Sequence, residues 1–119
     1  MTPDAVSALV ERELAEFRYD PPAPDSGLLG TSWSAERVAR GIDALRAALV
    51  PPRPVALRVQ AFGTRDLESR EAWAVAEVDG LLVVYDVVAC EFALAELAVD
   101  GEVADINVRG DLVGTFLAA

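Results

Sequence analysis

Carboxylates are the chemical groups that this chain concentrates in one place. The segment 71–108 contains nine Asp or Glu residues and no Lys, Arg or His, whereas the rest of the chain holds all ten cations and eleven acids. The net charge of −10 therefore belongs almost wholly to one segment. Such a concentrated negative field attracts a basic partner and speeds its association. The nine residues are Glu71, Glu77, Asp79, Asp86, Glu91, Glu96, Asp100, Glu102 and Asp105.

The same segment carries aromatic side chains, which often supply much of the affinity in protein interfaces. We therefore expect a negative surface that binds a basic protein, with carboxylates speeding association and aromatic residues as anchors. Nucleic acid is disfavoured as a partner, because this field repels phosphates. The competing interpretation is that carboxylates on strands keep a sheet soluble and prevent edge pairing. The predicted partner-binding residues are Trp73, Glu77, Asp79, Tyr85, Asp86, Glu91, Phe92 and Glu96.

Groups for other chemistries are few. Because His and Lys are absent, the chain has no histidine base or metal ligand, no lysine Schiff base and no Ser-His-Asp triad. Ser32 lies in a stretch that resembles a nucleophile elbow, but no His exists to activate it. Asp100, Glu102 and Asp105 lack the spacing of a calcium loop, and Cys90 has no adjacent cation. We predict no catalytic residue, metal or cofactor, and no enzymatic activity.

Length and composition favour one globular domain over residues 1–119. Apolar residues make up 53% of the chain and charged residues 25%, enough to build a single core. A single cysteine forms no intrachain disulfide, and the N-terminus lacks the pattern of a signal peptide, so the cytoplasm is the expected compartment. The apolar run Leu81–Cys90 is short and contains Asp86, so no membrane span is expected. The oligomeric state stays open.

Apolar residues at helical spacing predict two amphipathic helices in the first half of the chain. The first, over 3–19, begins where Thr2 can cap and Pro3 suits the first helical position. The second, over 34–50, begins with Ser34 as cap and ends before Pro51. The buried positions are expected at Val6, Leu9, Val10, Leu14 and Phe17 in the first helix and at Val38, Ile42, Leu45 and Leu49 in the second.

From Val55 onward the apolar pattern changes to a period of two, which predicts strands. The Asp79-Gly80 dipeptide favours a type I′ turn between two of them, and it pairs Val78 with Leu81. The same register would pair Ala76 with Val83 and Ala74 with Tyr85, and it would leave Trp73, Val75 and Asp86 on a partly exposed opposite face. The predicted strands are 55–62, 72–78, 81–86, 91–98 and 103–108, followed by a short helix over 111–117.

These elements define an α+β domain. Two N-terminal amphipathic helices would pack on a four- to five-stranded antiparallel meander sheet, and a short C-terminal helix would close the core. The preferred functional hypothesis is a small intracellular binding protein, such as an inhibitor, immunity-type or escort protein for a basic toxin or nuclease. The alternative is a small-ligand binder or carboxylate-dependent enzyme with a cone-shaped fold of the nuclear-transport-factor-like type. Its acid would be Asp86, raised in pKa by apolar burial.

Overall fold

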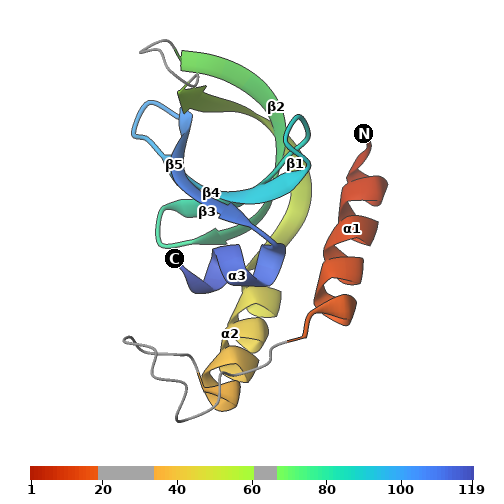
Figure 1. The fold of residues 1–119 in the computed structure, drawn as a ribbon. Helices are drawn as coiled ribbons and strands as arrows, with labels where there is room; N and C mark the ends of the chain where they lie inside the picture. The colour runs from red at the N-terminus through yellow and green to blue at the C-terminus, as the bar shows by residue number, and fades with distance from the viewer. Residues whose placement is uncertain (19–33, 61–66) are drawn as a thin grey trace.

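The strands of the computed structural model close into a barrel, and three helices lie against the outside of it (Figure 1). The structure describes residues 1–18, 34–60 and 67–119. The α+β class and the order of elements agree with the sequence prediction. The elements are α1 (Pro3–Glu16), α2 (Ala35–Ala48), β1 (Leu49–Gln60), β2 (Leu67–Val78), β3 (Leu81–Asp86), β4 (Glu91–Leu97), β5 (Val103–Gly110) and α3 (Leu112–Leu117).

Both long helices begin where their caps predict. The Thr2 hydroxyl accepts a hydrogen bond from the N–H of Ala5 at 3.2 Å, and the Ser34 hydroxyl accepts one from the N–H of Arg37 at 3.1 Å. These bonds satisfy amide groups that lack a partner within the helix. The first helix ends earlier than predicted, because Phe17 already has an extended backbone. The buried helical residues are Val6, Val10 and Leu14 in α1 and Val38 and Leu45 in α2.

The first strand begins six residues earlier than predicted. Leu49 follows α2 directly and already pairs with Ala76 of β2, but the next pair is Arg53 with Ala74. Pro51 and Pro52 fall in the irregular stretch between these two pairs, where a missing N–H removes no ladder bond. The helix ends at Ala48, two residues earlier than predicted, and Leu49 and Val50 belong to the strand, which the prolines do not exclude. The last two residues of the predicted strand 55–62 lie outside the described residues.

The meander is antiparallel, as predicted, and a parallel pairing then closes it. Each strand from β1 to β5 pairs antiparallel with the next. In addition, β1 pairs parallel with β5 through Leu57 with Val103 and Arg58 with Ala104. This closure was not predicted, because it joins residues far apart in the sequence. It removes the free sheet edges over the paired residues.

The β2–β3 hairpin has the predicted turn but only part of the predicted register. Asp79 and Gly80 have φ values of 49° and 81°, as a type I′ turn requires. The pairs of Val78 with Leu81 and of Ala76 with Val83 are confirmed. The third pair was wrong, since a register shift between Ala74 and Ala76 brings Trp73, not Ala74, opposite Tyr85. A bulge of this kind cannot be read from alternation alone.

The barrel has an apolar layer on each side of its wall. The inner cluster consists of Leu57, Val59, Ala72, Ala74, Leu82, Val84, Ala93, Ala95 and Val103. On the outer side, the helices cover β2, β3 and β4 (Figure 1). Trp73 and Val75 belong to this outer layer and are 5% and 1% exposed. The predicted exposure of their face was therefore wrong, because the helices cover it. Within the described residues, no helix has the length and apolarity needed to cross a bilayer.

Candidate functional site

The fold divides the carboxylates of segment 71–108 into two groups. The side chains of Asp86 and Asp105 are 0% and 3% exposed, and Glu91 is 39% exposed. All three form ion pairs with cations that flank the segment in the sequence. The remaining carboxylates are exposed or half-buried on the surface. One group is therefore paired with two arginines, and the other determines the field outside the protein.

The buried group is a charge cluster held by Arg70 and Arg109. Nη1 of Arg109 lies 2.9 Å from Oδ2 of Asp86 and 3.2 Å from Oε1 of Glu91. Its Nη2 donates to Oδ2 of Asp105 at 3.0 Å. Nη1 of Arg70 reaches the same Oδ2 of Asp86 at 3.1 Å. The two residues that border the acidic segment thus supply the cations that the segment itself lacks.

Strand geometry brings the members of this cluster together. Asp86 pairs with Ala72 on one side and with Glu91 on the other, so Asp86 and Glu91 share a face of the barrel wall. In β5 a register irregularity lies around Asn107, which has a φ of 64°. This irregularity sets Asp105 and Arg109 opposite Ala95 and Ala93 of β4, which are only two residues apart. The bulge therefore places an acid and a base side by side on the inner face.

The carboxylate of Asp86 is held in its ionised form. Burial alone would raise its pKa, but hydrogen bonds from Arg109, from the N–H of Ala89 and from Arg70 outweigh burial and lower the pKa. Its Oδ1 also accepts the N–H of Val88 at 3.0 Å and that of Ala89 at 3.2 Å. A general acid needs the opposite, a carboxyl with a raised pKa. Asp86 is buried, as the enzyme alternative expects, but its pKa is lowered and not raised.

This arrangement suits a structural role for the cluster. Burial would lower the pKa of Arg109, but its hydrogen bonds with Asp86 and Asp105 raise the pKa above the ordinary value. Arg109 consequently stays charged and links β5 to β3 and β4, while Arg70 links β2 to β3. A buried charge of this kind is costly unless it is paired. We regard the cluster as a structural clamp, that is, a set of ion pairs that holds strands β2 to β5 together, and not as a reactive centre.

Apart from Glu71 on β2, the surface group lies at one end of the barrel. The N–H of Leu97 donates to the carbonyl of Gly80 at 3.1 Å, so the β2–β3 and β4–β5 turns lie side by side. Among the described residues, Glu102 is the only acid at this end with a cation partner, Arg58 at 3.0 Å. The other acids at this end of the barrel form no ion pair within the described part of the chain. We call this set the acidic rim: Glu77, Asp79, Glu96, Asp100 and Glu102.

Apolar side chains are exposed at the same end of the barrel. Val99 lies in the β4–β5 turn and is fully exposed, and Leu97, at the end of β4, is 37% exposed. Exposed apolar groups beside charged ones are typical of protein-binding surfaces. These two residues were missed in the sequence. The available signal was an apolar residue directly before the Asp100-Gly101 turn, where a polar residue is usual.

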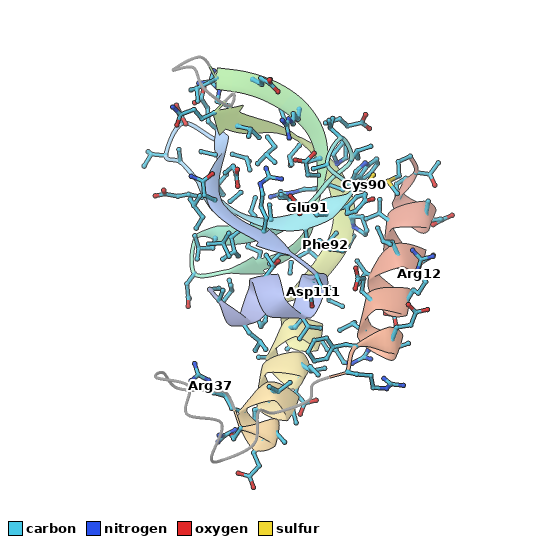
Figure 2. The ribbon with its side chains drawn as sticks, in the orientation of Figure 1. Arg12, Arg37, Cys90, Glu91, Phe92 and Asp111 are labelled. Atoms are coloured by element: carbon cyan, nitrogen blue, oxygen red, sulfur yellow. The ribbon has the colours of Figure 1, made fainter. Side chains whose placement is uncertain are left out.

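The predicted aromatic anchors are not on this surface. Trp73 and Phe92 are 5% and 1% exposed and pack under the helices. Tyr85 is half-buried, with its ring 5.2 Å from that of Phe92. Glu91 and Phe92 are neighbours on β4 (Figure 2), but only Glu91 joins the charge cluster. Of the eight predicted partner-binding residues, the structure brings together Glu77, Asp79 and Glu96 on the acidic rim.

The sequence offered three further candidates for chemistry: Cys90, the acids around Asp100 and Asp105, and Ser32. Cys90 is exposed in the β3–β4 turn, where it has a φ of 55°. Within residues 1–18, 34–60 and 67–119, no three acids or cysteines are arranged to hold a metal ion. Asp100 and Asp105 each accept a backbone N–H two residues further on, at 3.0 Å and 3.2 Å. Ser32 lies outside the described residues.

Comparison with known proteins identified no relative of this chain. No protein-family model matches the chain, and searches of curated proteins and of solved structures found no significant match. The geometry of the chain itself is therefore the evidence on function.

Proposed function

We propose that this protein is a small acidic binding module that covers a basic surface of another protein through its acidic rim. Its concrete form would be an inhibitor, immunity-type or escort protein for a basic partner such as a toxin or nuclease. One observation carries the proposal. Exposed carboxylates without a cation partner in the described structure lie at the barrel end that also exposes Leu97 and Val99.

The contrast between the two groups of carboxylates supports this proposal. Acids that serve only the fold have cations beside them, as Asp86 has Arg70 and Arg109. The rim acids Glu77, Asp79, Glu96 and Asp100 have no cation partner among the described residues, so their charges repel one another. Such repulsion is relieved when a cationic partner arrives, so the rim favours complex formation.

The carboxylates of the acidic rim and the apolar residues beside them would contribute to binding in different ways. Rim carboxylates accelerate encounter and lose strength as salt rises, because the Debye length is about 8 Å at physiological ionic strength. Desolvation of Leu97 and Val99 would supply affinity that does not depend on salt. The predicted partner therefore presents Lys or Arg side chains around an apolar patch.

Affinity capture from the native lysate tests this proposal when two variants of equal charge are compared. The rim variant carries Glu77→Gln, Asp79→Asn, Glu96→Gln and Asp100→Asn. The control carries Asp4→Asn, Glu16→Gln, Glu36→Gln and Asp43→Asn, which remove the same number of exposed charges from the helices. We expect one stoichiometric basic protein with the wild type and the control and its loss with the rim variant. Equal recovery by all three proteins would contradict the proposal.

A further inference from the structure

Strand β2 extends past the end of β3. Its last pair with β3 is Ala72 with Asp86, and the N–H of Val87 then donates to the carbonyl of Glu71 at 3.4 Å. Among the residues that the structure describes, 67–70 pair with β1 alone. In Figure 1 this part of β2 lies at the top of the view, away from β3. The start of β2 thus presents an edge to which another strand could be added.

The backbone groups of this edge point outward. The bond from Val87 shows that the carbonyl of Glu71 points away from β1. No register shift falls between residues 67 and 72, so the N–H and the carbonyl of Ser69, two residues before Glu71, point the same way. The side chains of Leu67, Glu68 and Ser69 are exposed. Ser69 therefore offers both a donor and an acceptor to an incoming strand.

Two opposite charges flank Ser69. Glu68 and Arg70 share one face of the strand, where Nε of Arg70 lies 3.2 Å from Oε2 of Glu68. Nη1 of Arg70 contacts Asp86, but its Nη2 has no hydrogen-bond partner within the described part of the chain. The side chains of Arg70 and Glu68 are 24% and 50% exposed. Each of them can therefore accept a second partner of opposite charge.

We propose that two copies of this chain pair antiparallel through this edge, with the two-fold axis at Ser69. The two Ser69 residues would exchange two backbone hydrogen bonds. Glu68 of each copy would lie directly opposite Arg70 of the other, and opposite charges in cross-strand pairs stabilise a sheet. An axis at Glu68 or at Arg70 would instead bring like charges together. The charges therefore make the edge complementary to itself in one register only.

The shared ladder is short, so the dimer should be weak. Its area falls in the class of small, transient interfaces. We expect Kd to be on the order of 100 µM. The net charge of −10 on each copy opposes association, but salt screens this repulsion beyond about 8 Å. This inference does not depend on the function of the acidic rim.

Disulfide cross-linking of the full chain tests the position of the axis. In the Cys90→Ser background, Ser69→Cys would place two Cα atoms about 5.5 Å apart, a distance that a disulfide spans. Glu71→Cys is the matched control on the same face of β2, and its two Cα atoms would be about 14 Å apart. We expect mild oxidation to convert the Ser69→Cys protein into a covalent dimer and to leave the Glu71→Cys protein monomeric. Equal cross-linking of the two variants would overturn the proposal.

Analytical ultracentrifugation tests the charge pairs. Glu68→Arg places Arg opposite Arg at two positions of the dimer, so we expect Kd to rise roughly tenfold. Glu71→Arg changes the net charge by the same amount on the other face of the strand, and it should dimerise at least as well as the wild type. The proposal is also overturned if the wild type stays monomeric up to about 1 mM. The same change of Kd in both variants would locate any dimer elsewhere and would overturn it too.

Discussion

Nη1 of Arg109 lies 2.9 Å from Oδ2 of Asp86, and this contact joins a residue just outside the acidic segment to its fully buried carboxylate. Arg70, just before the segment, approaches the same oxygen at 3.1 Å. The segment that appears free of cations in the sequence thus receives two arginines from its own borders, which pair with three of its carboxylates. Among the described residues, the acids of the segment without a cation partner lie on the surface: Glu71 on β2, and Glu77, Asp79, Glu96 and Asp100 at the acidic rim.

Loss of the Asp86 carboxylate should destabilise the fold. Asp86→Ala leaves Arg70 without its buried partner and removes one of the three carboxylates around Arg109. Both arginine side chains are about one fifth exposed, so water compensates part of the loss. We expect a decrease of about 2–3 kcal/mol in the free energy of unfolding, measured by urea denaturation. Glu71→Gln, on an exposed residue, should change it by no more than about 0.5 kcal/mol. Equal effects of the two changes would argue against a clamp.

Acid should weaken the same cluster. The folded-state pKa of Asp86 lies below the ordinary value of 3.8, so its contribution to stability is complete above that value and is lost as the pH falls through the folded pKa. Glu13 acts in the opposite sense, since burial and the nearby Asp111 raise its pKa. The quantity to measure is therefore the difference in unfolding free energy between the wild type and the Asp86→Asn variant. We expect this difference in unfolding free energy to shrink below about pH 4. A difference independent of pH between 7 and 3 would contradict the assignment.

The type I′ turn should be sensitive to its glycine. Gly80 has a φ of 81°, in the region that costs an L-residue roughly 1–2 kcal/mol, and a Cβ there would meet open space. Gly80→Val should therefore destabilise the hairpin by about that amount through backbone strain alone. Asp79→Asn is the matched change in the same turn and should be nearly neutral, because Asn tolerates the left-handed region. Thermal unfolding of the two variants measures the contrast, and a neutral Gly80→Val would exclude this explanation.

Thr115 in α3 offers a stabilising change. Its hydroxyl is buried and has no hydrogen-bond partner within the described part of the structure. Thr115→Val keeps the shape of the side chain and removes the unsatisfied group, so we expect a gain of about 1 kcal/mol in unfolding free energy. Thr115→Ser keeps the hydroxyl and loses the methyl group, and it should destabilise the protein. Destabilisation by both changes would mean that the hydroxyl does have a partner.

Local chemistry determined most of what the sequence could predict. The Asp79-Gly80 turn, the strand over 81–86 and the caps at Thr2 and Ser34 each depend on a few neighbouring residues, and the structure has them in place. The period of two from Val55 also predicted a half-buried strand, and in β1 Leu57 and Val59 are buried between exposed neighbours. Interactions between residues that are close in the sequence can be recognised from the local sequence itself.

Long-range pairing accounts for what the sequence could not show. The parallel contact of Leu57 with Val103 closes the barrel, and no local pattern marks it. The helices cover the face of the sheet that carries Trp73 and Val75, which removed an expected anchor from the surface. The ion pairs of Asp86 join residues from three strands. Composition therefore revealed the acidic segment but not its division into a buried cluster and an exposed rim.

The most direct test of the acidic rim as a binding surface is the affinity of the purified, captured partner at two salt concentrations. Calorimetry with the wild type, the rim variant and the helix control at about 50 mM and about 300 mM salt separates surface charge from apolar contact. We predict that Kd for the wild type and the control rises roughly tenfold with salt, whereas the rim variant binds weakly at both concentrations. The same Kd for all three proteins, unaffected by salt, would contradict a function of the rim in binding.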